Sequence, residues 1–465
     1  MTRTTTLGTG FEQLRTAVQA DLLSRMPDHI ERLRWSREQI EASQREGLRA
    51  LLAQALENSP FHRRRLGGID PGRFELSDIG SLPVMTKAEM MESLDEVFTD
   101  RRLNRGLVEQ ALAATVAEPI PILGQYTALA SGGVSGQRGV FVFNRQAFVS
   151  YFSSLSRSQT ARMQAMGGPP PGGVPIAMVS AASAVHMTGS VRAWSVGGQM
   201  PLSLVPVPVT LPLPEIVRRL NELQPPVVSG YPSMLARLAA EQLAGRLRIA
   251  PRSVTSSSET LTPAMRAAIA EAFKAPIFDV FGSSEGLVGA SGPDDEVLVF
   301  NSDLCIAELV DVENRPVPPG VPSAHVLVTN LYNLTQPLIR YELTDSFVRQ
   351  ADAAEHGHLR AKVRGRADGM LHYEGVDIHP LAVETVMVRS PETLDYQVRQ
   401  TLRGIDVDAL AVVSVDRDRL ASQLVAALAE AGLHDPVVTL RIVDHLERLP
   451  DTGKIRRFVP LPALA

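Results

Sequence analysis

The sequence has a single cysteine, Cys305, in 465 residues. One thiol excludes an internal disulfide and a cysteine-rich metal site. The flanking residues, DLCIAELV, have the pattern of a buried strand. We therefore interpret Cys305 as a small core residue rather than as a catalytic thiol.

An excess of basic residues is also absent, because 46 Lys and Arg stand against 51 Asp and Glu, for a net charge of −5. This balance argues against a nucleic-acid partner. The first ten residues, MTRTTTLGTG, lack the apolar segment of a signal peptide, and no stretch reaches the roughly 18 uninterrupted apolar residues of a membrane span. With 44% hydrophobic and 21% charged residues, we expect a soluble, cytoplasmic protein with no membrane partner.

Strand and helix patterns alternate through the middle of the chain, which predicts α/β layers. Short apolar segments bounded by Gly, Pro or polar clusters predict strands at 174–180, 225–231, 275–281, 304–310 and 324–331. Helical spacing predicts helices through 48–56, over 233–245 with Ser233 as a possible cap, and over 263–274. Residues 58–60 should end the first of these helices, and Thr86 should cap a helix near Lys87. The segment 201–214 is too rich in proline for a central strand.

The last hundred residues have the pattern of a separate small α+β unit. It comprises strands at 409–416 and 437–444 around a helix at 417–431, with Leu420, Leu424 and Leu428 on one face. The charged, glycine-containing segment 363–369 suits a hinge. We therefore expect a large α/β domain over 1–365 and a smaller domain over 366–465.

Two glycine- and serine-containing segments could bind phosphate. In the loop from Ser131 to Gly139, four glycines and two serines expose N–H groups and hydroxyls, although an ordinary flexible turn has the same composition. In 278–286, a strand runs into Gly282, Ser283, Ser284 and Glu285, where a carboxylate could hold Mg²⁺ and the serines could meet phosphate. The alternative interpretation of this second segment is a polar turn with a solvated glutamate.

Two further segments carry isolated charges. Arg340 to Asp345 suggests a strand end that presents a carboxylate able to accept two hydrogen bonds from a ribose diol, although Asp is common at strand ends. Thr452-Gly453-Lys454 could project an ammonium group into a cleft, or could be a solvated basic tail. His186 has no second metal ligand at a suitable spacing, and an isolated histidine of this kind is more often structural.

The order of these segments is more specific than any one of them. It resembles the adenylate-forming superfamily of acyl-CoA synthetases, adenylation domains and luciferases. Within it, the chain is most similar to the phenylacetate-CoA ligase family. That similarity rests on LENSPFHRRRL (56–66), LPVMTKAEM (82–90), LTQPLIRYELTD (334–345) and GRADGMLHYEGVDIHPLAVE (365–384).

The resemblance implies a large multi-layered N-terminal adenylation domain, a small mobile C-terminal domain and two half-reactions. A carboxylate first attacks the α-phosphate of MgATP, giving an acyl-adenylate and pyrophosphate. The small domain then rotates, and a thiol, usually that of coenzyme A, displaces AMP. The expected ligands are thus ATP, Mg²⁺, coenzyme A and a small carboxylic acid, and the expected state is a monomer or a homodimer.

The resemblance also implies a role for individual residues. Three residues would be catalytic. Lys454 would serve adenylation, Ser284 would contact the α-phosphate and Glu285 would bind Mg²⁺. The phosphate loop, adenine pocket and ribose site would be formed by Ser131, Gly133, Ser135, Gly136, Ser258, Glu259, Thr260, Asp279, Phe281, Gly282, Asp345 and Arg366. The acyl pocket would be formed by His186, Gly230, Tyr231, Pro232 and Ser283, and the hinge would lie at Asp368.

The chain departs from the family pattern in the phosphate loop. Val134, Gln137 and Arg138 stand where a hydroxyl residue, Lys and Pro are usual, and Glu342 stands where Arg is common. Glu285, Asp345 and Lys454 are intact, which argues against an inactive relative. We therefore expect an aryl- or arylalkyl-carboxylate–CoA ligase. The alternatives are an adenylating enzyme that uses a carrier protein, an amine or another nucleophile, and a nucleotide-binding relative without turnover.

Overall fold

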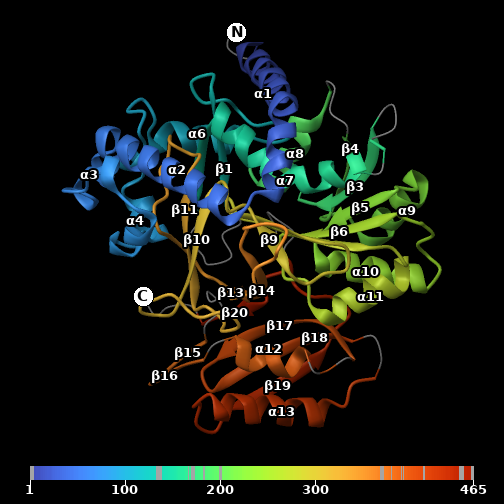
Figure 1. Ribbon diagram of the computed structural model, residues 1–465. Helices are drawn as coiled ribbons and strands as arrows, with labels where there is room; N and C mark the ends of the chain where they lie inside the picture. Colours follow the sequence, from blue (N-terminus) through green and yellow to red (C-terminus); the bar gives the residue numbers. More distant parts are fainter. Residues whose placement is uncertain are drawn as a thin grey trace.

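The computed structural model describes residues 5–131, 139–165, 167–168, 173–181, 184–197, 202–366, 371–378, 380–388, 390, 392–411, 414–449 and 455–461. Mixed α/β structure runs through the chain, as expected (Figure 1). None of the helices in these ranges is long and apolar enough to cross a membrane.

Helices form the N-terminal part of the molecule. They are α1 (Thr5–Glu31), α2 (Arg37–Asn58), α3 (Pro60–Arg65), α4 (Lys87–Glu92), α5 (Leu94–Val97) and α6 (Arg105–Ala114), with 3₁₀ turns at Arg32–Arg34, Pro71–Arg73 and Leu76–Ser81. The expected end of a helix at 58–60 is confirmed, since Ser59 closes α2 and its hydroxyl accepts the His62 N–H at the start of α3. Thr86 caps α4, also as predicted.

A nine-stranded sheet crosses the centre of the molecule in the order β13-β14-β9-β8-β7-β6-β5-β3-β4 (Figure 1). Its parallel half alternates with helices and runs through β3 (Val174–Ser180), α8 (Met187–Ser195), β4 (Leu202–Pro208), α9 (Leu213–Leu223), β5 (Val227–Gly230), α10 (Pro232–Leu243), β6 (Ser253–Ser257), α11 (Pro263–Phe273) and β7 (Ile277–Gly282). The antiparallel half contains β8 (Val288–Ser291), β9 (Leu298–Phe300), β13 (Asp345–Arg349) and β14 (Arg360–Arg366).

As expected, the proline-rich segment is not a central strand, because it forms the edge strand β4. Among the described residues β4 pairs only with β3, so prolines cost it no ladder hydrogen bond on its free side. One detail differs from expectation at α10. Tyr231 is its N-cap and Pro232 its first residue, so Ser233 lies inside the helix instead of capping it.

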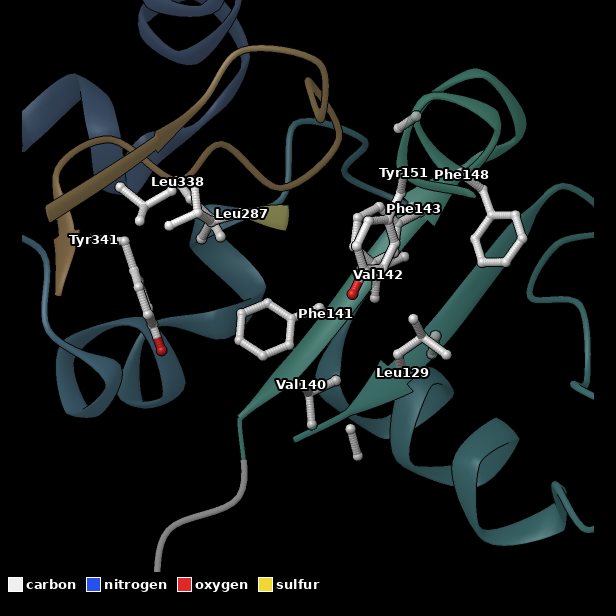
Figure 2. Close-up of a cluster of buried hydrophobic side chains, with 14 of the residues drawn as sticks. Leu129, Val140, Phe141, Val142, Phe143, Phe148, Tyr151, Leu287, Leu338 and Tyr341 are labelled. Carbon is white, nitrogen blue, oxygen red and sulfur yellow. The ribbon is translucent and has the colours of Figure 1, made fainter. Parts of the chain in front are cut away.

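Two smaller sheets complete the large unit. β1 (Tyr126–Ala130) and β2 (Val140–Asn144) form a hairpin that leads into α7 (Arg145–Ala165), while β10 (Cys305–Val310), β11 (His325–Asn330) and β12 (Tyr341–Leu343) form an antiparallel sheet. Figure 2 shows the aromatic core between them, where the rings of Phe143 and Tyr151 stack with centroids 5.3 Å apart. Cys305 is buried in this core, as expected.

The last part of the chain has its own sheet and core, at the bottom of Figure 1. It contains β15 (Leu371–Tyr373), β16 (Val376–Ile378), α12 (Leu381–Val388), β17 (Thr393–Thr401), β18 (Gly404–Ala411), α13 (Arg417–Glu430), β19 (Val437–Ile442) and β20 (Phe458–Val459). Leu420, Leu424 and Leu428 face its core from α13, as their spacing predicts. A domain boundary at 365/366 stays a prediction, as does the hinge at Asp368, which lies outside the described ranges.

Candidate active site

The carboxyl ends of β5, β6 and β7 meet at one edge of the large sheet. Their parallel register places Gly230 beside Ser256, and Ser257 beside Val280. In parallel α/β sheets this edge is where ligands usually bind. The register therefore groups three of the segments that the sequence singled out: 230–232, 258–260 and 281–285.

The turn after β7 is held from several sides. Tyr151 donates a hydrogen bond of 2.6 Å from its hydroxyl to the Ser283 carbonyl, and the N–H of Leu287 bonds the Ser283 hydroxyl at 3.2 Å. Asn330 donates to the Glu285 carbonyl at 2.8 Å. Glu285 itself is buried, and Ser284 beside it is half-buried. These bonds fix the backbone of the turn, and a carboxylate carried by such a turn would be a suitable oxygen ligand for Mg²⁺ beside phosphate groups.

Gly286 closes this turn in a conformation that only glycine adopts easily, with φ of +108°. Its carbonyl accepts hydrogen bonds from Asn301 and Tyr332, both at 3.1 Å. A Cβ atom at this position would lie 2.2 Å from Asn330 Nδ2 and 2.4 Å from the Tyr332 hydroxyl. The Gly286 backbone therefore sets the position of Glu285.

Asp279 and Phe281 lie on β7 ahead of the turn. The Asp279 carboxylate accepts a hydrogen bond from the Ser256 hydroxyl, and its backbone N–H bonds Ser291 Oγ at 2.9 Å. Burial raises the pKa of Asp279 above its usual value, although the Ser256 hydrogen bond acts in the opposite direction. The Phe281 ring meets Phe347 edge to face with centroids 5.2 Å apart, which joins β7 to β13.

Asp345 begins β13, where it is buried and pairs in register with Arg366 on β14. This pairing brings together the two residues that were expected at the ribose site. Arg340, just upstream, is instead structural, because it forms a buried ion pair with Glu308 at 3.0 Å and donates to two backbone carbonyls.

Four of the five expected acyl-pocket residues lie around the N-termini of α8 and α10, while Ser283 lies in the turn after β7. His186 is the N-cap of α8, and its Nδ1 lies 3.2 Å from the Ala130 carbonyl, directly before Ser131. Tyr231 is fully buried, and its hydroxyl accepts the Ala181 N–H at 3.1 Å. Gly230 leaves room for β3, since a Cβ atom there would lie 2.8 Å from the Val179 carbonyl oxygen.

Glu259 makes contacts that sequence reasoning did not anticipate. Its Oε2 accepts the Ser233 N–H at 3.3 Å, and its Oε1 accepts the Ile455 N–H at 3.1 Å. Ile455 directly follows Lys454 in the sequence. The segment expected at the adenine pocket is thus bonded to the chain next to the expected adenylation lysine.

Several expected residues cannot be placed. Gly133, Ser135, Gly136, Asp368 and Lys454 lie outside the described ranges, as do Val134, Gln137 and Arg138. The start of the phosphate loop is described, and there Ser131 Oγ accepts the Gly139 N–H at 2.8 Å. Within the described part of the chain, no group of three or more His, Cys, Asp or Glu side chains could hold a metal ion by itself.

Sequence reasoning missed the residues that hold the site together. They are Tyr151, Ser256, Ser291, Asn301, Asn330, Tyr332 and Arg448. Most of them bond backbone groups far away in the sequence, so no local motif marks them. Asn330 and Tyr332 had the one available signal, since they lie at the end of the predicted strand 324–331 and just after it, as Glu285 lies just after β7.

Comparison with known proteins gives relatives that span most of the chain. Phenylacetate-coenzyme A ligase of Thermus thermophilus is 27% identical over 383 residues, which cover 78% of each chain. The enzymes of the same name from Escherichia coli and Aromatoleum evansii are 25% and 23% identical, and these matches cover 81% of this chain and 82% of each relative. No protein-family model matches the chain.

Solved structures share the fold. A 2-hydroxyisobutyryl-CoA ligase in its postadenylation state has a TM-score of 0.65 at 17% identity, covering 90% of this chain and 88% of that chain. The same ligase in its thioesterification state has a TM-score of 0.56 at 18% identity, covering 90% and 89%. A benzoate CoA ligase from Burkholderia xenovorans has a TM-score of 0.50 at 18% identity, covering 71% and 67%. The chain is therefore a homologue of phenylacetate-coenzyme A ligases, with the fold of the adenylate-forming ligases.

Proposed function

We propose that this protein is an ATP-dependent acid–thiol ligase. A carboxylate oxygen of a small acid attacks the α-phosphorus of MgATP, and the bond from that phosphorus to pyrophosphate breaks. The thiol of coenzyme A then attacks the acyl carbon, AMP leaves, and the thiol proton passes to solvent. An arylacetic or benzoic acid is the substrate class that we propose, because the relatives that match most of the chain are named phenylacetate-coenzyme A ligases.

The observation that best supports the first half-reaction is the hydrogen bond from Ile455 to Glu259. Ile455 lies just before β20 of the small sheet, whereas Glu259 follows β6 of the large sheet. The contact supports the proposal because Ile455 directly follows Lys454 in the sequence, and Glu259 lies at the edge where Asp279 and Glu285 are found. In the proposed function, Glu285 binds Mg²⁺ of the nucleotide, and Asp345 accepts hydrogen bonds from the ribose.

Charge neutralisation is the chemical task of this site. A carboxylate and ATP repel each other, so preorganised cations and N–H donors are needed where negative charge accumulates. We assign this role to Lys454, to the loop 131–139 and to the bound Mg²⁺. The small unit over 366–465 would then move, with a hinge near Asp368, so that the thiol can reach the same acyl group.

Lys454→Ala tests this assignment. We expect acid-dependent pyrophosphate release to fall about 100-fold or more, since the loss of one preorganised electrostatic contact typically costs that much. Thioester formation from a supplied acyl-adenylate and coenzyme A should continue. Lys362→Ala is the matched control, because it removes a lysine that pairs with Glu296 at the surface. Equal pyrophosphate release by Lys454→Ala and the unmodified protein would refute the role of Lys454.

The altered phosphate loop favours a second candidate function. Positions 137 and 134 lack the usual lysine and hydroxyl, as could occur in an adenylating enzyme of a biosynthetic pathway. The acceptor of the acyl group would then be a carrier-protein thiol or an amine instead of coenzyme A. Pyrophosphate release that proceeds without any coenzyme A thioester would select this second function.

A further inference from the structure

A cavity of about 470 Å³ opens between the N-terminal helices and the β1–β2 hairpin. It is bordered by the end of α2, the segment 99–101, the start of β1, the end of β2 and the segment after β11. Three of these elements, α2, β1 and β11, lie in the left half of Figure 1. The volume is within the range of about 300 to 1,000 Å³ that is typical of small-molecule sites, so a small molecule would fit.

This cavity is separate from the nucleotide edge of the large sheet. In the hairpin, Tyr126 pairs with Asn144 at the cavity, whereas Ala130 pairs with Val140 at the opposite end, beside the expected phosphate loop. The two ends are roughly 13 Å apart, at about 3.3 Å per residue of strand. A ligand in the cavity would therefore not occupy the position expected for the nucleotide.

Two sequence segments that the proposed function leaves largely unused meet at the cavity. Asn58 belongs to the segment 56–66, and Thr335 belongs to the segment 334–345. From these two segments the proposed function uses only Asp345. Their convergence on one cavity is what a second site in this part of the chain requires.

The walls of the cavity are held in place by hydrogen bonds within the protein. Thr99 donates its hydroxyl to the Leu334 carbonyl at 2.8 Å and its backbone N–H to the Thr335 carbonyl at 3.0 Å. Arg101 Nη1 donates to the Asp95 carbonyl at 2.7 Å. The lining is thus preorganised, which lowers the entropic cost of binding a ligand there.

Three side-chain amides line this cavity: Gln54 and Asn58, one turn apart on α2, and Asn144 at the end of β2. Gln54 and Asn58 are half-buried, and within the described ranges their side chains form no hydrogen bond. Asn144 Oδ1 accepts the Ala147 N–H at 2.9 Å, and its NH₂ group is an additional donor. These amides can both donate hydrogen bonds to a ligand and accept them from it.

The carboxylate that lines the cavity, Asp100, is neutralised by a neighbouring arginine. It accepts hydrogen bonds of 2.6 Å from both Arg102 Nη2 and the Tyr126 hydroxyl. The Arg102 hydrogen bond holds the pKa of Asp100 well below its usual value, so the carboxylate stays ionised and paired. Arg101 is exposed at the rim, where solvent screens its charge, and the other lining residues are uncharged. A phosphate or a metal ion therefore meets no unpaired opposite charge among these side chains.

We propose that this cavity binds a small neutral molecule with several hydroxyl groups, such as a sugar or another polyol. Each hydroxyl of such a molecule donates and accepts, as the amides of Gln54, Asn58 and Asn144 do. The Tyr126 oxygen and the Asp100 carboxylate add acceptors. This site is distinct from the acid and nucleotide sites of the proposed function, and it does not depend on that function.

Titration calorimetry of the full chain tests the proposal directly. The probes are ribose, glucose, myo-inositol, sorbitol and maltose, with inorganic phosphate as the charged probe. We expect saturable binding of at least one of the five polyols. The binding should persist when AMP is present in excess, because the nucleotide site is elsewhere.

Asn58→Ala and Gln54→Ala locate the bound polyol. Each should raise its dissociation constant about fivefold, the effect of one lost hydrogen bond, and the double variant should raise it about 25-fold. Since neither amide is bonded within the described part of the chain, both variants should melt close to the temperature of the unmodified protein. Glu57→Ala is the control, because Glu57 is exposed on the same helix and does not line the cavity.

The remaining outcomes would overturn the proposal. Binding that AMP displaces, or that both alanine variants leave unchanged, would place the polyol elsewhere on the molecule. Binding of phosphate that the two variants weaken would show that the cavity selects an anion, and no binding of any of the five polyols would refute the ligand class. Acid-dependent pyrophosphate release tests the ligase function alone, so the failure of one proposal is distinguishable from the failure of the other.

Discussion

At the scale of single residues, the site depends on backbone geometry as much as on charged groups. Glu285 is positioned by Gly286, whose carbonyl is bonded by Asn301 and Tyr332. None of these three residues has a charge that would mark it as functional. The carboxylate and the turn that presents it nevertheless form one unit, so a change at the glycine should affect both stability and activity.

Gly286→Ala should be strongly destabilising. The new Cβ atom would lie within 2.4 Å of both Asn330 Nδ2 and the Tyr332 hydroxyl, at a φ of +108°. We expect a loss of about 2 to 4 kcal/mol in the free energy of unfolding, as for other buried steric conflicts, measured by urea denaturation. Gly292→Ala is the control, because a Cβ atom there would meet nothing closer than 3.8 Å. Similar stability of the two variants would contradict this description of the turn.

A buried histidine predicts a dependence of stability on pH. Burial, together with the charge of Arg65, lowers the pKa of His62 from 6.5 to about 3. The folded protein keeps His62 neutral, whereas the unfolded chain takes up a proton below pH 6.5. The free energy of unfolding is therefore unaffected by His62 above pH 6.5, and it decreases as the pH falls from 6.5 toward 3. Between pH 6 and 5 the loss from His62 should be about 1 kcal/mol.

The pH dependence is measured by urea denaturation at both values. His62→Gln, which keeps an N–H for the Pro337 carbonyl, should lose less stability than the unmodified protein between pH 6 and 5. His434→Gln changes an exposed histidine and should leave the difference unaltered. If all three proteins respond identically, His62 is not neutral in the fold.

At the scale of elements, the local sequence was enough to predict where a helix begins when a capping residue or a first-turn proline marks its start. Thr86 and Pro263 both begin helices as their sequence context predicts. Ser233 shows the limit of this reasoning. Its hydroxyl suits a cap, but Pro232 takes the first helical position, and the Ser233 hydroxyl instead accepts a hydrogen bond from Arg448, 215 residues away.

The cap at Thr86 provides a quantitative check. Its hydroxyl accepts the Glu89 N–H at 3.2 Å, and the Glu89 carboxylate accepts the Thr86 N–H at 2.9 Å. Thr86→Ala should lower the free energy of unfolding by about 1 kcal/mol, while Thr86→Ser should cost much less. Thermal unfolding of the two variants measures the difference, and equal melting temperatures would show that this capping box does not stabilise the fold.

Strands were harder to predict where tertiary pairing creates them. β12 has only three residues, and it exists because Tyr341 to Leu343 pair with β11. The prolines of 201–214 argued only against a central strand, and β4 indeed lies at the sheet edge, where prolines are tolerated. The local motifs of the site, such as Gly282 to Glu285, were predictable because each is continuous in the sequence. The residues that bond to these motifs were not predictable, because only the tertiary fold brings them together.

At the scale of the whole molecule, two sheets with separate cores are joined near the proposed site. α11 contacts β17, and Glu259 bonds Ile455. An arrangement in which one small unit brings a lysine to the nucleotide and then withdraws it allows two reactions to use one acyl group in sequence. The proposed ligase function would use this division.

The most direct test of the ligase function is pyrophosphate release with MgATP across benzoic, arylacetic, aminobenzoic and short aliphatic acids, each with and without coenzyme A. The account predicts release with an aromatic acid, faster turnover when coenzyme A is added, and an acyl-CoA thioester as the product. No pyrophosphate with any acid, or pyrophosphate that never leads to a coenzyme A thioester, would contradict it.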